Sequence, residues 1–303
     1  MPNLTRARLR QLTGSGVASS DATLRLEKGP HPGRDGVSCS SFKITGQGAS
    51  IPCLMVQPPN NLPIRGAVIY AHAHGNRPDI GKQELVIGRP ALLDPPLGVW
   101  LALQGFVVIS PDLPGFGERQ HEGTESSLAK AALWQGSSLL GAMVDDLQLV
   151  LNWLQSDPMY AHLPKLVAGF SMGATLASFL GAMRTDISAV IQICSFANLA
   201  PLLKTGAHDL HGHYMTVPGL LPNYDLSDVA RLVSPRPHFV AVGLQDPITP
   251  EFAVRPAIEK LADQYFQVGA EAALSQHIDI EAGHAETMKM RLVLKSFLTR
   301  HFS

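Results

Sequence analysis

A serine between two glycines, in the segment 169–173 (Gly-Phe-Ser-Met-Gly), is the feature that most constrains how this chain can fold. The apolar residues 165–168 before it are typical of a buried strand, and the apolar residues 174–180 after it are typical of a helix. A strand that passes directly into a packed helix makes a sharp turn, and neighbours without side chains leave room for that turn. The segment therefore predicts a serine hydroxyl held at the carboxyl end of a sheet, beside the first amides of a helix.

Two further residues follow strand-like segments and complete a nucleophilic set. The segment 238–243 is predicted to be a strand that turns into Asp246, and the alternating segment 277–280 is predicted to be a strand that turns into His284. A serine hydroxyl becomes a good nucleophile only when a histidine removes its proton and a carboxylate orients that histidine. We therefore predict Ser171 as the nucleophile, His284 as the general base and then acid, and Asp246 as the orienting carboxylate.

Each of these assignments has an alternative in the sequence. Ser171 is also compatible with a packing serine in a glycine-rich turn, and Asp246 with a residue that only shapes a turn. The competing carboxylates and histidines are Asp209, Asp225, Asp228, His277 and His301. The order serine, acid, histidine, each just after a predicted strand, favours the catalytic interpretation.

The order of predicted elements indicates an α/β fold with a mostly parallel central sheet flanked by helices. Apolar strands are expected at 66–71, 105–110 and 189–194, and helical segments lie between them. Strands that alternate with helices pair in parallel through right-handed crossovers, and such sheets carry their sites beyond the carboxyl ends of the strands. The three predicted catalytic residues and the turn 72–76 are expected to converge there.

One long helix is predicted from helical periodicity. Between residues 137 and 157 the apolar residues recur at helical spacing and face one side. The polar residues on the other side are Asp145, Asp146, Gln148, Asn152 and Gln155. This pattern predicts a surface helix that covers the sheet with its polar face toward solvent. A second helix is expected from residue 285 to residue 301.

The chain is predicted to divide into two parts. Residues 1–63 are expected to form an N-terminal extension of short strands packed on the core, and residues 64–303 the α/β domain itself. The segment 198–233 interrupts the alternation of strands and helices and is rich in Gly, Pro, His and Tyr. It is expected to lie over the site as a loop or small lid.

Charge and composition exclude several classes of partner. A formal net charge of −1 argues against a nucleic acid or an anionic membrane as the main partner. The three cysteines show no metal-type spacing and are expected to be free thiols in a reducing compartment. No signal-peptide pattern and no apolar run of roughly 20 residues is present, so we expect a cytoplasmic protein without a membrane span. A homodimer through exposed apolar surface stays open.

Over residues 64–300 the chain resembles the α/β-hydrolase superfamily, and more narrowly its dienelactone-hydrolase-like and acetyl-xylan-esterase-like serine hydrolases. Besides the serine turn and the acid and histidine turns, the resemblance is carried by the segments 70–76, 111–119, 217–222 and 234–237. It implies ester or related acyl hydrolysis without a metal or organic cofactor. The chain departs from the pattern at two points. Dienelactone hydrolases proper use a cysteine where this chain has Ser171, and many relatives have His-Gly where it has His72-Ala73.

The resemblance also implies an oxyanion hole. Its donors would be the backbone N–H of Met172 and one from the turn after the first core strand, that of His74. Donors of this kind are worth about 3 kcal/mol each in the transition state. The side chain of His72 either lines the substrate pocket or braces the turn, and bracing is the favoured interpretation.

A histidine-rich stretch is predicted to line the acyl or alcohol pocket. Its residues are His208, His211, His213, Tyr214 and Met215. Imidazoles this close together are also compatible with zinc binding. However, their spacing does not match two ligands one helical turn apart, and a serine triad needs no metal, so we predict no metal site.

The sequence thus predicts a serine hydrolase that cleaves a small or medium carboxylic ester through an acyl-enzyme intermediate. Hydrolysis of an amide or a carbon–carbon bond and acyl transfer to another alcohol remain as alternatives, since a triad does not choose its leaving group. A non-catalytic binding protein that kept the fold is a further alternative. The sequence does not identify the substrate.

Overall fold

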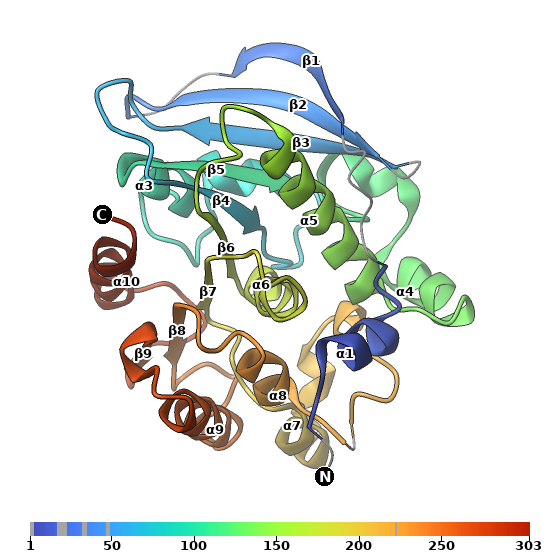
Figure 1. The fold of residues 1–303 in the computed structure, drawn as a ribbon. Helices are drawn as coiled ribbons and strands as arrows, with labels where there is room; N and C mark the ends of the chain where they lie inside the picture. The colour runs from blue at the N-terminus through green and yellow to red at the C-terminus, as the bar shows by residue number, and fades with distance from the viewer. Residues whose placement is uncertain (1–2, 17–22, 32–34, 47–48, 222) are drawn as a thin grey trace.

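Figure 1 shows a computed structural model of the chain, which describes residues 3–16, 23–31, 35–46, 49–221 and 223–303. These residues form a nine-stranded sheet in the order β1-β2-β3-β5-β4-β6-β7-β8-β9. The strands are β1 (Thr23–His31), β2 (Ser38–Gly46), β3 (Ala49–Gln57), β4 (Gly66–Ala71), β5 (Phe106–Pro111), β6 (Lys165–Phe170), β7 (Ala189–Ile193), β8 (His238–Gly243) and β9 (Leu274–Asp279).

The sheet is mixed and mostly parallel. Strands β5, β4, β6, β7, β8 and β9 pair in parallel, whereas β1, β2 and β3 are antiparallel and join the rest where β3 pairs with β5. Every residue of β4, β5, β6, β7 and β8 is buried, as in parallel sheets that carry helices on both faces. The predicted α/β-hydrolase fold class is confirmed.

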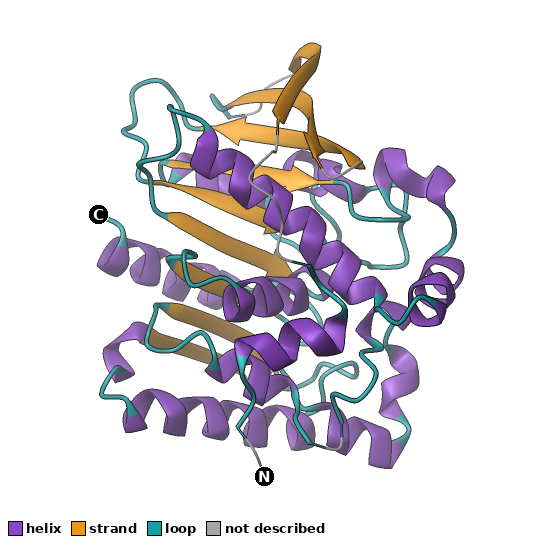
Figure 2. Cartoon of the chain, turned by 45° about the vertical axis from the view of Figure 1, so that its right-hand side comes forward, coloured by secondary structure: helices purple, strands orange, loops and turns teal. Residues whose placement is uncertain are grey.

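Helices cover both faces of the sheet (Figure 2). The α-helices are α1 (Arg6–Thr13), α2 (Glu84–Ile87), α3 (Leu97–Leu103), α4 (Glu125–Trp134), α5 (Leu139–Ser156), α6 (Met172–Met183), α7 (Leu199–Thr205), α8 (Leu226–Arg231), α9 (Glu251–Gln267) and α10 (Met288–His301). The short 3-10 helices are η1 (Gly81–Gln83), η2 (Gly117–Glu122), η3 (Ala207–Leu210), η4 (His213–Met215) and η5 (Glu271–Ala273). One apolar cluster joins α1, α5, α6 and α8 to one face, and another joins α3 and α10 to the other.

Helix α5 matches the predicted helix, but of the five polar residues on its predicted solvent side only Gln155 is exposed. Gln148 is fully buried and Asn152 is 8% exposed. Segments distant in sequence cover them: Gln148 donates to Ser15 Oγ at 3.1 Å, and the Arg184 guanidinium donates to Asn152 Oδ1 at 2.8 Å. The pattern was therefore correct for the helix and wrong for the solvent exposure of that side, because periodicity does not reveal which partners cover a polar face.

The N-terminal residues contain the predicted strands and also a helix that the sequence did not predict. Helix α1 begins after Thr5, whose hydroxyl accepts the N–H of Arg8, and ends at Gly14 in the left-handed conformation. It packs on α5 and α6, and Arg10 donates to the Met183 carbonyl at 2.8 Å. Strand β3 pairs with β5, so the N-terminal strands extend the same sheet as the strands after residue 64. The division into two parts between residues 63 and 64 stays a prediction.

Cys39, Cys53 and Cys194 are all free and buried. No helix within the described ranges has the length and apolar character that a membrane crossing requires.

Candidate active site

Ser171 lies on the turn between β6 and α6, in a conformation that residues with side chains rarely adopt. Its φ is 56° and its ψ is −123°. The two glycines allow this turn to pack closely. A Cβ on Gly173 would lie 1.8 Å from the Ala71 carbonyl oxygen, and one on Gly169 would lie 2.2 Å from the carbonyl carbon of Gly173. The start of α6 therefore sits directly against the end of β4, with the serine raised at the sheet edge.

The structure brings the three predicted catalytic residues together. His284 Nε2 lies 2.9 Å from Ser171 Oγ, and His284 Nδ1 lies 2.6 Å from Asp246 Oδ2. Asp246 follows β8, and His284 follows β9. Asp246 and His284 lie 75 and 113 positions after Ser171 in the sequence. Because these parallel strands end at the same edge, the three residues form one continuous hydrogen-bonded chain.

The environment of Asp246 fixes the tautomer of the histidine. The carboxylate is 1% exposed and accepts the Ile248 N–H and the Thr249 hydroxyl, both at 2.8 Å. Burial raises the pKa of Asp246, but the hydrogen bond and charge of His284, together with these two donors, outweigh burial and hold the pKa below its ordinary value. An ionised Asp246 accepts the Nδ1–H of His284, which leaves the lone pair of Nε2 toward Ser171 Oγ, the arrangement that a general base requires.

The competing residues have other positions. Asp225 caps the start of α8, and Asp228 pairs with a lysine of α9. His277 lies within β9, His301 ends α10, and Asp209 lies in η3.

The turn after β4 contains the predicted oxyanion donor. The Ala73 N–H is already used, since both carboxylate oxygens of Glu84 accept it at 3.1 Å. Across the residues that the structure describes, neither the His74 N–H nor the Met172 N–H has an acceptor. Met172 is the first residue of α6, where N–H groups have no partner within the helix. Their assignment to an oxyanion hole stays a prediction.

His72 braces the turn and does not line a pocket. The ring is fully buried, with Nδ1 at 3.1 Å from the Ala73 carbonyl oxygen and Nε2 accepting the Leu113 N–H at 3.2 Å. Burial lowers the pKa of His72, so the neutral ring donates at one nitrogen and accepts at the other. The placement of His72 among the pocket residues is thus corrected in favour of bracing, because both ring nitrogens are used within the fold.

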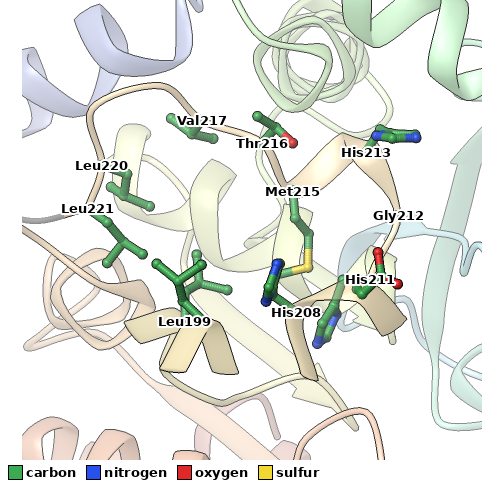
Figure 3. A pocket seen from close by; sticks show the side chains of 12 residues that line it. Leu199, His208, His211, Gly212, His213, Met215, Thr216, Val217, Leu220 and Leu221 are labelled. Carbon is green, nitrogen blue, oxygen red and sulfur yellow. The ribbon is translucent and has the colours of Figure 1, made fainter. Parts of the chain in front are cut away.

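A cavity of about 370 Å³ lies within the predicted lid segment 198–233. Figure 3 shows an apolar group on one side of this cavity and imidazoles on the other. Its lining includes four of the predicted pocket residues, His208, His211, His213 and Met215. Tyr214 is not among them: it is buried, and its ring is stacked 6.2 Å from the ring of His74.

His211 connects this cavity to the acid turn. Its Nε2–H donates to the Ile248 carbonyl at 2.9 Å, and the N–H of that same residue donates to Asp246. Burial lowers the pKa of His211 and keeps the ring neutral. Within the described residues, no group of three or more His, Cys, Asp or Glu is arranged to hold a metal ion.

Two carboxylates that sequence reasoning missed hold the turn after β4. Glu84, which is almost fully buried, accepts the Tyr70 hydroxyl at 2.7 Å and forms an ion pair with Arg89, besides holding Ala73. Glu125 contacts the ring of His74. The only local signal for Glu125 is that it follows Thr124, the residue that caps α4. Nothing near either residue in sequence reveals the contact.

Comparisons with known proteins agree with this geometry. The chain is 32% identical over 234 residues to the "Putative hydrolase YtaP" of Bacillus subtilis (strain 168), which covers 77% of this chain and 78% of the relative. The "putative acetyl xylan esterase" of Bacteroides fragilis NCTC 9343 superposes with a TM-score of 0.70 at 19% identity, over 90% of this chain and 73% of the other. Acetyl xylan esterase 1 of Thermoanaerobacterium sp. superposes with a TM-score of 0.61 at 15% identity, over 98% and 92%.

These structural likenesses carry the fold alone, and no protein-family model matches the chain. The sequence relative is close enough, and covers enough of both chains, to establish membership. Together with the serine turn, the sheet order and the turns that follow β8 and β9, this sequence identity places the chain in the α/β-hydrolase family that includes the Bacillus hydrolase.

Proposed function

We propose that the protein is a serine hydrolase that cleaves a small or medium carboxylic ester through an acyl-enzyme intermediate. The observation that carries the proposal is the hydrogen-bonded chain from Asp246 through His284 to Ser171, with the serine at 2.9 Å from the base. This arrangement activates a hydroxyl for attack on an acyl carbon.

The reaction proceeds in two halves. Ser171 Oγ attacks the ester carbonyl carbon as its proton passes to His284 Nε2, and the N–H groups of Met172 and His74 bind the developing oxyanion. The imidazolium, stabilised by Asp246, then gives its proton to the departing alkoxide. Water enters and gives a proton to the same Nε2 as it attacks the acyl-enzyme, which releases the acid and restores the serine.

One observation favours an ester over an amide. Several structural neighbours are esterases by name, including acetyl xylan esterases and a methylesterase. The adjacent cavity of about 370 Å³ suits a group of small or medium size, and Leu199, Leu220 and Leu221 give it an apolar side. We assign this cavity to one of the two substituents of the ester, with His208, His211, His213 and Met215 on its lining.

The test is covalent labelling with a fluorophosphonate, mapped by mass spectrometry, followed by a panel of p-nitrophenyl esters and anilides of increasing acyl length. The expected adduct is on Ser171, and Ser171→Ala removes both labelling and turnover. Ser178→Ala, which changes a buried serine in the same helix, is the control and keeps both. An unlabelled wild-type protein would refute the proposal, and anilide turnover above ester turnover would redirect it to amides.

A further inference from the structure

Glu125 joins three segments that meet beside the oxyanion turn. It is the first residue of α4, and its side chain is 20% exposed. Oε2 lies 3.1 Å from Nε2 of His74, in the turn after β4. Oε1 accepts the N–H of Tyr214 at 2.9 Å, in η4 of the segment 198–233. One carboxylate therefore holds both the predicted oxyanion turn and the segment that surrounds the cavity.

The ring of His74 is fixed at both nitrogens. The Asn76 N–H donates to Nδ1 at 3.1 Å, so Nδ1 carries a lone pair and Nε2 carries the proton that Glu125 accepts. The ring also packs edge-on against Phe116, with the two centroids 5.3 Å apart. A side chain held on every side restricts the backbone of the same residue, whose N–H is the proposed oxyanion donor.

The surroundings leave room for this carboxylate and keep it charged. A Cβ on Gly212 would lie 2.4 Å from Glu125 Oε1, so glycine is required there for the carboxylate to reach the Tyr214 N–H. Burial raises the pKa of Glu125, but the hydrogen bonds from His74 and from the Tyr214 backbone outweigh burial and bring the pKa below its ordinary value. The ionised carboxylate accepts both bonds at once.

The same short helix that Glu125 holds also borders the cavity. His213 and Met215 line the cavity, whereas Tyr214 between them faces the His74 ring (Figure 3 shows the two lining residues). A group bound in the cavity therefore contacts η4, which Glu125 holds through the Tyr214 N–H. The second hydrogen bond of Glu125 connects η4 to the ring of His74, whose backbone N–H is the proposed oxyanion donor.

We propose that Glu125 is a positioning residue for hydrolysis: through the ring of His74 it fixes the oxyanion turn, and through Tyr214 it couples that turn to the cavity segment. The inference rests on the proposed function, because it assigns a role to Glu125 in that reaction. It adds a residue whose carboxylate is bonded to the oxyanion turn and to the cavity segment, and not to the triad, among the described residues.

The decisive variant is Glu125→Gln. The amide oxygen can accept only one of the two bonds, and its NH₂ group faces either the Nε2–H of His74 or the N–H of Tyr214. Since misplacing catalytic groups by about 1 Å costs about 100-fold, we expect kcat to fall about 10-fold in Glu125→Gln and about 100-fold in Glu125→Ala, with KM changed less than twofold. The affinity for a trifluoromethyl ketone, which forms the oxyanion, should fall in parallel.

Glu251→Gln is the matched control. Glu251 is also the first residue of its helix, α9, so the variant loses the same charge near a helix N-terminus. Within the described part of the chain, however, Glu251 pairs only with exposed Arg255. Wild-type kcat in Glu251→Gln separates positioning from a general effect on helix stability.

A double-mutant cycle with His74→Ala tests whether Glu125 acts through this ring. The backbone N–H survives in His74→Ala, and the double variant with Glu125→Ala should be no slower than His74→Ala alone. A second readout needs no turnover: ¹⁵N NMR should show the Nε2–H form of the His74 ring in the wild type, and this Nε2–H signal should shift in Glu125→Gln because the ring loses its carboxylate acceptor.

Glu125→Gln with wild-type kcat and ketone affinity, in an enzyme whose Ser171 is still labelled, overturns the inference and leaves the proposed function standing. An unlabelled wild type overturns the proposed function. In that case an unchanged His74 ring signal in Glu125→Gln would still show that Glu125 does not fix the turn.

Discussion

The two edges of the parallel sheet use their polar groups in opposite ways. At the amino edge, Lys165 begins β6 and its ammonium donates to three backbone carbonyls at 2.6 to 2.7 Å. Arg236, just before β8, donates to the carbonyls of three residues that follow or end α6. At the carboxyl edge, the N–H groups of Met172 and His74 have no acceptor among the described residues. Groups whose bonds are all made within the fold stabilise it, and donors left over can act on a substrate.

Two histidines sharpen this comparison. His238 opens β8, is fully buried, and donates from Nε2 to the Gln192 side chain at 2.8 Å. Burial, together with the charge of Arg236, lowers its pKa to about 3, so this ring stays neutral. His284 has a side chain 22% exposed, with Nδ1 2.6 Å from the Asp246 carboxylate and Nε2 2.9 Å from Ser171 Oγ. The environment, and not the residue type, distinguishes a structural histidine from the proposed base.

Replacing the carboxylate of Asp246, at the carboxyl edge of the sheet, should have the largest effect, and this effect is on kcat. In Asp246→Asn the amide no longer fixes the Nδ1–H tautomer, and we expect kcat to fall about 10⁴-fold. Asp228→Asn, which removes a carboxylate paired with Lys260 away from the triad, serves as the control. Steady-state kinetics decides the matter: a wild-type kcat in Asp246→Asn would mean that another group orients His284.

The packing behind the serine should be the next most sensitive feature. Gly173→Ala places a methyl 1.8 Å from the Ala71 carbonyl oxygen and forces α6 away from β4, so we expect a loss of about 3 kcal/mol in the free energy of unfolding. Gly16→Ala meets nothing within 4 Å and should change it by less than about 0.5 kcal/mol. Urea denaturation measures both, and equal midpoints would contradict the close packing described here.

The amino edge should affect stability without affecting chemistry. Lys165→Met leaves three carbonyls without their shared donor, and we expect the free energy of unfolding to fall by about 2 kcal/mol while kcat stays within twofold. Lys130→Met, at an exposed position of α4, is the control. If kcat fell while the free energy of unfolding stayed unchanged, the amino edge would have a role in the chemistry, and the proposed difference between the two edges would be wrong.

The last effect should appear as a pH dependence, which leaves the stability at neutral pH unchanged. The pKa of His238 is about 3 in the fold and about 6.5 when unfolded, so the unfolded chain binds the extra proton between these values. This stability is complete above pH 6.5 and is lost as the pH falls toward 3, at up to about 1.4 kcal/mol per pH unit. His238→Gln should remove that slope, whereas exposed His162→Gln should keep it. Urea titrations at pH 7 and pH 5 give the comparison.

The sequence predicted what depends on local spacing. Two glycines around Ser171, and one polar residue just after each of two strands, were enough to predict that Ser171, Asp246 and His284 lie together, because parallel strands end at the same edge. The opposite held for contacts between distant segments. Glu84 and Glu125 lie 11 and 51 residues from the turn that they hold, and no periodicity reports such a contact.

The histidines show the same limit in another form. His72, His74 and His211 each precede a small residue in the sequence, yet the structure places the first in the core, the second on the turn after β4 beside Glu125, and the third on the cavity. Burial on an irregular turn depends on which segments fold over it, and this cannot be derived from composition. Helix α1 was missed for the same reason, since its apolar side is defined only by the helices on which it packs.

The docking of α1 also sets an order of events during synthesis. Ser15 donates to Asp145 at 2.5 Å, and Arg10 reaches the carbonyl of Met183, so this helix finds its partners 130 to 173 residues after it leaves the ribosome. At roughly 5–20 residues per second, translation leaves it unpartnered for roughly 7 to 35 seconds. During that interval α1 has none of these packing partners, and it depends on its arginines to remain hydrated.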